Sequence, residues 1–159
     1  MGRFRSESKR AAEDDMGFMR AALEEACAAE RAGELPVGAV IVCGGEVIAK
    51  AANRTEERGN ALSHAELNAI TAACGALGKK TLEGCSLYVT LEPCPMCAGA
   101  IINSRIPTVV FGAKDENTGS CGSVINLFEE RYGHKPAIYG GVRAEESARL
   151  LKEFFKKAR

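Results

Sequence analysis

Apolar residues recur along this chain at two spacings, which predict two kinds of element. Five segments carry apolar residues three or four positions apart, as on one face of a helix: 14–32, 63–74, 94–103, 124–132 and 144–157. Five shorter apolar runs are bounded by glycine or polar turn residues, which predicts strands: 37–42, 46–52, 85–90, 108–111 and 137–139. The chain is therefore predicted to mix helices and strands.

The order of these segments predicts the architecture. Gly44-Gly45 separates the first two strands, which is a strong signal for an antiparallel hairpin. The later strands are separated by helices, which predicts right-handed parallel crossovers. We therefore predict an α/β fold of three layers, α/β/α, around a mixed five-stranded sheet. Binding sites in such folds form outside the carboxyl ends of the strands.

The two ends of the chain differ in character. Residues 1–13 are polar and are predicted to form a disordered tail, with the first helix starting at Asp14 or Asp15. Residues 14–159 are numerous enough to bury one core, so they are predicted to form a single domain. No apolar run is long enough to cross a membrane.

Charge and cysteine content bear on the binding partners and the cellular compartment of the chain. Basic and acidic residues number 21 each, so the chain has no net charge, and any contact with a nucleic acid must come from a local patch. The residues that could form one on the last helix are Lys152, Lys156, Lys157 and Arg159, although a solvated helix face explains them equally well. The seven cysteines are odd in number and scattered, which indicates reduced thiols in a cytoplasmic protein.

Two short motifs carry the candidate chemistry. Ser63-His64-Ala65-Glu66 is followed, from residue 93, by Pro93-Cys94-Pro95-Met96-Cys97. One imidazole and two thiolates suit a tetrahedral Zn²⁺, and three protein ligands leave the fourth position to water, as in catalytic zinc sites. Glu66 lies close enough in sequence to move protons at that water. This combination matches the established signature of zinc nucleobase deaminases.

Each motif also has a plainer interpretation. Ser63 and Glu66 have the spacing of a capping box, in which Glu66 would only cap a helix. Cys94 and Cys97 could instead form a redox pair or belong to a structural zinc site with a fourth ligand. The residues that could supply that ligand are His134 and five single cysteines, Cys27, Cys43, Cys74, Cys85 and Cys121. Asn53, after the second strand, could contact a base or simply turn the loop.

A longer set of residues resembles a known family, the bacterial tRNA-specific adenosine deaminases. The resemblance runs from about Asp15 to the C-terminus, and its matching stretches are Pro36–Val40, Asn53-Arg54, His64–Glu66, Leu87–Ala100, Ser104–Ile106, Val109–Asp115 and Thr118-Gly119. It implies a cytidine-deaminase-like fold, in which residues 14–159 form a single zinc-dependent deaminase domain. The implied protein is a homodimer that binds a tRNA anticodon stem-loop and converts the wobble adenosine to inosine.

The same resemblance implies a role for each matching residue. His64, Cys94 and Cys97 would hold one Zn²⁺ per chain, and Glu66 would shuttle protons. Three further residues would bind substrate: Asn53, Ala65 and Asp115. Two other functions share the zinc motif, namely deamination of a free base such as guanine or cytosine, and a non-catalytic zinc-binding module.

Overall fold

A mixed five-stranded sheet forms the middle layer of the structure, a computed structural model that describes residues 2–158, with side chains from residue 12 onward. The strands lie in the order β2-β1-β3-β4-β5. Their bounds are Gly38–Cys43 for β1, Glu46–Ala52 for β2, Cys85–Leu91 for β3, Thr108–Ala113 for β4 and Ala137–Tyr139 for β5. Strand β1 is antiparallel to both neighbours, whereas β3, β4 and β5 run parallel. The predicted mixed sheet is therefore confirmed.

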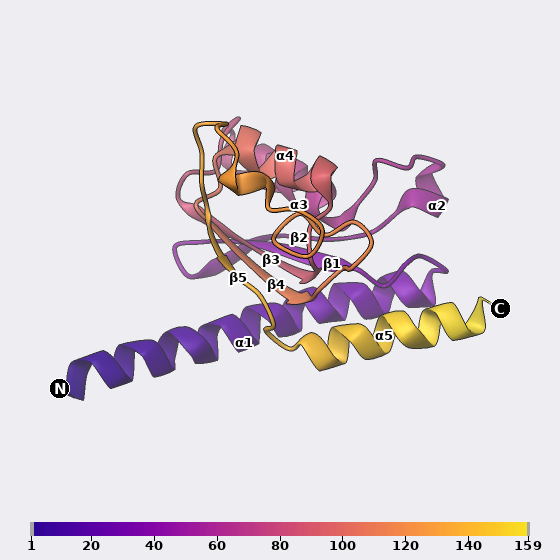
Figure 1. Cartoon of the computed structure of the whole chain (residues 1–159), viewed down its shortest axis with the longest axis horizontal. Helices are drawn as coiled ribbons and strands as arrows, with labels where there is room; N and C mark the ends of the chain where they lie inside the picture. Colours follow the sequence, from indigo (N-terminus) through magenta and orange to yellow (C-terminus); the bar gives the residue numbers. More distant parts are fainter. Residues whose placement is uncertain (1, 159) are drawn as a thin grey trace.

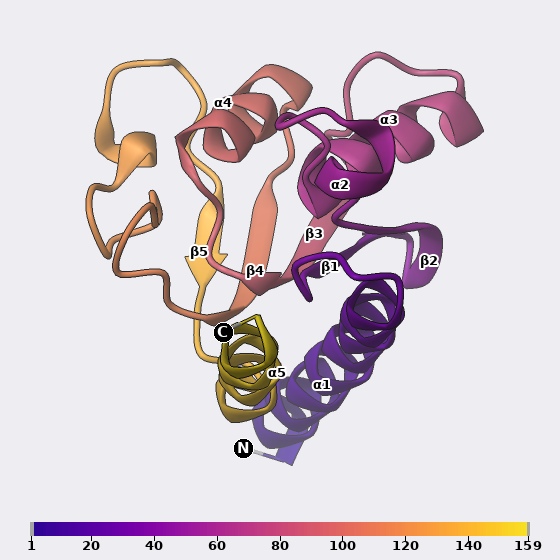
Figure 2. The same ribbon diagram turned by 90° about the vertical axis from the view of Figure 1, so that its right-hand side faces the viewer.

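Helices cover both faces of this sheet, which confirms the three-layer prediction (Figures 1 and 2). Helices α1 (Gly2–Arg31) and α5 (Ala144–Lys157) lie side by side on one face. Helices α3 (Ala65–Leu77) and α4 (Pro95–Ser104) lie on the other. A four-residue helix, α2 (Thr55–Arg58), and a 3₁₀ turn, η1 (Leu127–Glu129), sit in the connecting loops. No helix in residues 2–158 combines the length and the apolar composition needed to cross a bilayer.

The period-two alternation of the strands explains why both faces are covered. Val40, Tyr88 and Val110 are buried in a cluster with α1 residues such as Met19. Their neighbours along the strands are buried in the larger cluster that includes residues of α3 and α4, namely Ala39, Ile41, Leu87, Val89, Val109 and Phe111. Successive side chains point to opposite faces of a strand, so strands that are apolar at every position need a helical layer on each side.

The first helix is longer than predicted. It begins at Gly2, so the backbone is helical through the segment predicted as a tail and across the predicted start at Asp14 or Asp15. The segment from Arg3 to Asp15 has no proline or glycine and is rich in helix-forming alanine, glutamate, lysine and arginine, so no residue there stops a helix. Asp15 lies inside α1 and accepts a 2.5 Å hydrogen bond from the hydroxyl of Tyr88 on β3.

Other boundaries also differ from the prediction. Helix α3 continues through Gly75 to Leu77 and ends at Gly78, whose φ of 62° is the left-handed conformation common at helix ends. The helix predicted over 124–132 is wrong. Only the short η1 forms there, capped by the Asn126 side chain, which accepts a hydrogen bond from the Phe128 N–H. Phe128 is the one residue of η1 that is buried, so this segment has no apolar face to support a helix.

Candidate active site

Two helix starts meet at the carboxyl end of β3 and bring the motif residues together. His64 is the N-cap of α3, and Cys94 is the N-cap of α4, with Pro95 as the first helical residue. Cys97 lies one turn into α4 and is fully buried. The Nδ1 atom of His64 lies 3.6 Å from Sγ of Cys94 and 3.5 Å from Sγ of Cys97. Residues 30 and 33 positions apart in sequence thus share one small volume.

These separations fit a tetrahedral zinc ion. With zinc–sulfur bonds of about 2.3 Å and zinc–nitrogen bonds of about 2.0–2.1 Å, tetrahedral angles place nitrogen and sulfur about 3.6 Å apart. The three ligand atoms of His64, Cys94 and Cys97 all lie within 4.8 Å of one another, and this is the one such cluster in the described part of the chain. The residues present therefore fit a three-ligand zinc site.

Hydrogen bonds within this cluster shift the pKa values of its two thiols and its imidazole. A hydrogen bond from the Cys97 thiol lowers the pKa of Cys94 to about 4, and the same bond, together with burial, raises the pKa of Cys97. A hydrogen bond with Cys94 raises the pKa of His64. Both helices also direct their positive N-terminal ends at this point, which favours thiolate over thiol. Cys94 is therefore the donor that is shifted toward the thiolate that a metal cation prefers.

Glu66 lies beside the cluster and is not a helix cap. Glu66 is only 4% exposed and lies close enough to Cys97 for its charge to raise the pKa of that thiol. The alternative of a capping box is not supported, because His64 and not Ser63 is the N-cap, and the Ser63 hydroxyl bonds instead with Asn68 and Arg58. Burial raises the pKa of Glu66 to about 6. A buried carboxylate of this kind suits proton transfer near neutral pH.

A pocket of about 120 Å³, partly open to solvent, lies over this cluster. Six of its lining residues were proposed from the sequence: Asn53, His64, Ala65, Glu66, Cys94 and Asp115. Its other lining residues were not singled out from the sequence: Leu35, Val37, Leu91, Glu92 and Thr118. The mixed apolar and polar lining is typical of a small-molecule or single-base site.

The substrate-side candidates sit on two loops at the pocket mouth. Asn53 follows β2 and is 5% exposed, and its amide nitrogen donates a 3.3 Å hydrogen bond to the Thr55 hydroxyl. Asp115 follows β4, and its carboxylate accepts hydrogen bonds from the N–H groups of Asn117 and Thr118. Each residue therefore orders its own loop as well as lining the pocket.

The alternative ligands are not brought to the cluster. His134 lies elsewhere, with its Nε2 atom 2.7 Å from the carbonyl oxygen of Ile106. None of the five single cysteines joins the group of candidate ligand atoms among the described residues. A fourth protein ligand is therefore lacking in residues 12–158, which argues against a closed structural zinc site.

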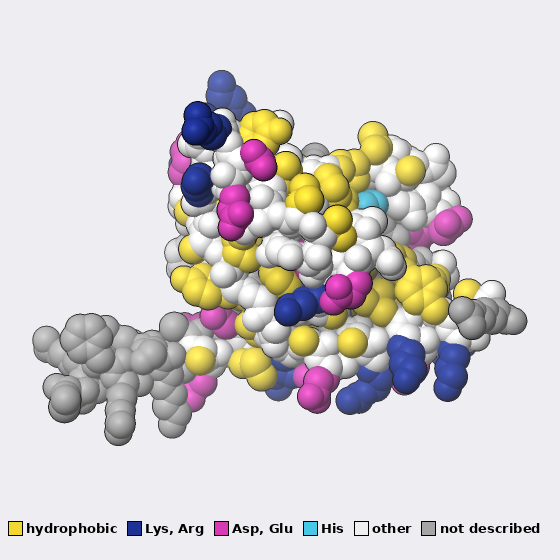
Figure 3. Space-filling model, viewed as in Figure 1, with side chains coloured by type: hydrophobic (Ala, Val, Ile, Leu, Met, Phe, Trp, Pro, Cys, Tyr) yellow, Lys and Arg dark blue, Asp and Glu magenta, His cyan; other side chains and the backbone are white. Residues whose placement is uncertain are grey.

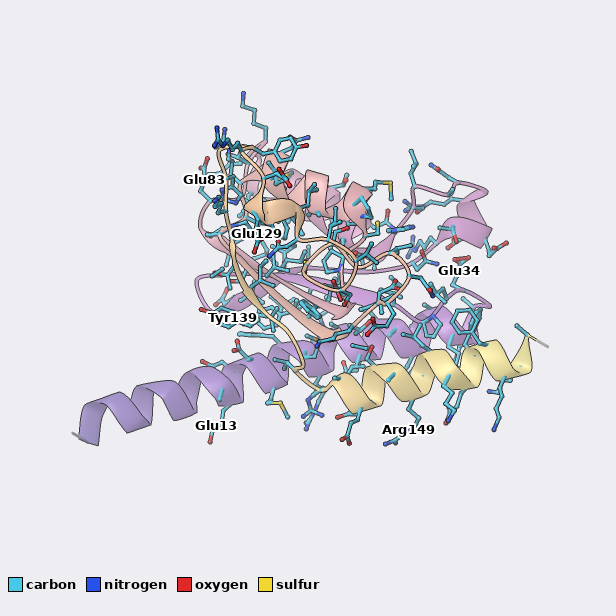
Figure 4. All side chains as sticks on the ribbon, in the orientation of Figure 1. Glu13, Glu34, Glu83, Glu129, Tyr139 and Arg149 are labelled. Atoms are coloured by element: carbon cyan, nitrogen blue, oxygen red, sulfur yellow. The ribbon has the colours of Figure 1, made fainter. Side chains whose placement is uncertain are left out.

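Two buried glutamates beside the pocket were missed by the sequence analysis. Glu92 lies between the end of β3 and Pro93-Cys94, and Glu34 lies after α1; each is 2% exposed. The carboxylate of Glu34, labelled in Figure 4, accepts hydrogen bonds of 3.2 and 2.8 Å from the N–H groups of Glu56 and Glu57 and so holds α2. In the sequence, the only sign of a role for either glutamate was that it stands as a single charged residue at the edge of an apolar segment.

Comparison with known proteins adds to this geometry. A family model described as MafB19-like deaminase matches residues 13–159. The chain is 49% identical over 143 residues to the tRNA-specific adenosine deaminase of Bacillus subtilis (strain 168), covering 89% of each protein. Both matches span nearly the whole chain, and both are to deaminases.

Two solved structures extend the comparison. One comes from studies of A-to-I editing by tRNA:A34 deaminases at the wobble position of transfer RNA. It is 45% identical, with a TM-score of 0.83, and the match covers 85% of this chain and 99% of that one. The other is a guanine deaminase from Bacillus subtilis, 34% identical with a TM-score of 0.61, and the match covers 77% of this chain and 82% of that one. Both the sequence and the structure are nearer to the first.

Proposed function

The chain belongs to the family of tRNA-specific adenosine deaminases, and from this premise we propose that it converts the wobble adenosine of a tRNA anticodon to inosine by zinc-dependent hydrolytic deamination. One observation carries the proposal. The buried Glu66 carboxylate lies with His64 and Cys94 in the lining of one pocket, and the ligand atom of Cys97 clusters with theirs. A base must leave its stack to enter such a pocket.

The residues divide the chemistry between them. His64, Cys94 and Cys97 would hold one zinc ion, which when bound supplies a Lewis acid that makes water a nucleophile near neutral pH. Glu66 accepts the proton of the attacking water and delivers protons to the ring nitrogen and to the departing ammonia of adenine. The attack is at C6, where oxygen replaces the amino group. Burial of Glu66 keeps bulk water from competing for these protons.

The pocket walls would orient the flipped nucleoside. Asn53 offers an amide that can both donate and accept hydrogen bonds to a base edge or a ribose hydroxyl. Ala65 is the first residue of α3, where backbone N–H groups lack helical partners and can face a ligand. Asp115 and its loop would lie beside the neighbouring nucleotides. These roles follow from the match to the family together with their positions in the pocket.

The substitution Glu66→Gln tests this proposal directly. Glutamine keeps the shape of the side chain but cannot accept and pass on a proton. We expect the variant to keep its zinc and its RNA binding and to lose adenosine-to-inosine conversion by at least ~10³-fold. Single-turnover kinetics on a tRNA anticodon stem-loop, with zinc measured in the same preparation, provides the test. Near-normal turnover by the zinc-loaded variant would show that Glu66 has no catalytic role.

The assembly and setting of the enzyme are also part of the proposal. We propose a cytoplasmic homodimer. Exposed apolar side chains on and around the last loops support self-association, namely Val124, Ile125, Tyr132 and Tyr139. Free cysteines throughout residues 12–158 support a reducing compartment. Light scattering on purified protein would return the mass of two chains, and the mass of one chain would rule the dimer out.

A further inference from the structure

Glu92 is a buried carboxylate whose partners all belong to one loop. Charged side chains are rarely buried without compensating partners. Here the compensation comes from the segment after β4. Oε1 of Glu92 accepts a 3.1 Å hydrogen bond from the Asp115 N–H, and Oε2 accepts bonds of 3.0 and 3.1 Å from the N–H groups of Cys121 and Ser123. The Ser123 hydroxyl donates a fourth bond to Oε1.

These four hydrogen bonds hold the loop at both of its ends, at Asp115 and at Cys121 and Ser123. Between Asp115 and Cys121 the chain turns tightly, with the Gly119 N–H donating to the Asp115 carbonyl at 2.9 Å. Gly119 lies directly on the carboxylate, since a Cβ there would come within 2.4 Å of Oε2 of Glu92. The part of the loop so enclosed carries Asp115 and Thr118, which line the pocket. One side chain therefore fixes the place of a whole pocket wall.

Glu92 also stands next to the segment that carries the candidate metal ligand Cys94. Glu92 precedes Pro93, whose carbonyl accepts a 2.8 Å hydrogen bond from the Ser120 N–H, and it lies two residues from Cys94. The backbone N–H of Glu92 also donates to the carbonyl of Ala113 at 2.8 Å. Any movement of the loop relative to the candidate metal ligands must therefore break bonds to residues 92 and 93.

We propose that Glu92 is a positioning residue for substrate: it holds the wall formed by Asp115 and Thr118 at the distance from Glu66 and His64 that a flipped nucleotide requires. Glu92 acts through the loop and not on the reacting atoms. The assignment of the substrate rests on the function proposed above, whereas the fixing of the loop does not. A side chain needed only for folding would affect stability and leave the enzymatic constants of the folded protein unchanged.

Glu92→Gln tests this with two matched controls. Glutamine has one acceptor oxygen in place of two, so it cannot keep all four bonds. Glu83→Gln makes the same change at an exposed position before β3, outside the pocket lining. Ser123→Ala removes only the hydroxyl donor. A pocket wall displaced by about an ångström can lower kcat/KM by about 10²-fold, and we expect most of this in KM because the wall contacts the substrate before reaction.

The measurements are kinetics on an anticodon stem-loop and hydrogen exchange of the zinc-loaded proteins. For Glu92→Gln we expect the raised KM and faster exchange at the amides of Asp115, Cys121 and Ser123, with a smaller change in the same direction for Ser123→Ala and none for Glu83→Gln. Unchanged KM and unchanged exchange in Glu92→Gln would overturn the proposal. If Glu92→Gln does not fold, an unchanged Ser123→Ala would overturn it instead. If the unaltered protein deaminates no RNA, the proposed function fails, but hydrogen exchange still decides whether Glu92 holds the loop.

Discussion

At the scale of single residues, the candidate metal ligands make the sharpest prediction. Cys97→Ser should lose stoichiometric zinc, because it removes a sulfur that lies 3.5 Å from Nδ1 of His64. Cys121→Ser is the matched control. Burial, together with the nearby charges of Glu92 and Glu66, raises the pKa of Cys121 to about 12. Cys121 is outside the cluster of candidate ligand atoms. Elemental analysis of the purified proteins should find one zinc per chain in Cys121→Ser and in the unaltered protein.

The opposite result would change the account of the site. A folded Cys121→Ser protein without zinc would make Cys121 a fourth ligand. Four protein ligands would leave no position for water, which is the arrangement of structural zinc sites. X-ray absorption on the unaltered protein provides an independent check, with one nitrogen and two sulfur ligands expected.

The sequence identified some site residues and missed others for a physical reason. His64, Glu66, Cys94 and Cys97 stand in two short motifs whose spacing already reflects their joint geometry. Glu34 and Glu92 act on backbone groups 22 to 31 residues away, with no motif to mark the pairing. Both glutamates bind loops that fold back onto them. The spacing of apolar residues along the chain does not show where such a distant loop will pack.

At the scale of elements, the strands and the buried helices were predictable because packing enforces their patterns. The errors lie where packing is weak. The segment 124–132 has exposed apolar residues such as Val124 and Ile125 and forms only the turn η1. The four-residue α2 has no buried residue and depends on Glu34 to hold its first N–H groups, so no apolar period announces it.

The packing of α1 against β1 makes a testable prediction. A Cβ at Gly38 would lie 2.0 Å from the Ala22 carbonyl oxygen and 2.6 Å from the Ala26 nitrogen, and both are backbone atoms of α1. Since neither backbone can move alone, Gly38→Ala should lower the free energy of unfolding by about 3 kcal/mol, at the upper end of overpacking costs. Thermal unfolding of the zinc-loaded protein measures the loss as a lower midpoint.

Gly75 supplies the control, because it is exposed in α3 and a Cβ there meets nothing within 4 Å. Gly75→Ala should raise stability by roughly 0.5–1 kcal/mol, the usual gain in a helix interior. The two substitutions are chemically identical and should have opposite signs. A Gly38→Ala protein as stable as Gly75→Ala would show that α1 and β1 are not packed this closely.

At the scale of the whole molecule, the chain has no net charge, and the face drawn in Figure 3 carries no continuous basic surface. Figure 3 shows Lys and Arg side chains along the edge formed by α5 and in a second group at the opposite corner, with acidic side chains between. On α5, Lys152 and Lys156 are exposed, and Arg149 points away from the body in Figure 4. Lys157 lies 3.5 Å from Glu30 of α1, whereas Arg159 is outside the described residues. Affinity for RNA should therefore come from local groups and from the pocket.

One measurement tests most directly whether the protein acts on a tRNA anticodon or on a free base. Zinc-loaded protein is incubated with an anticodon stem-loop carrying a wobble adenosine, and separately with free guanine and free cytosine, in water enriched in the heavy oxygen isotope. Mass spectrometry then follows each product. We predict inosine at the wobble position with heavy oxygen at C6, release of ammonia, and no product from either free base. Turnover of guanine or cytosine with an unchanged stem-loop would contradict the account and make the protein a free-base deaminase.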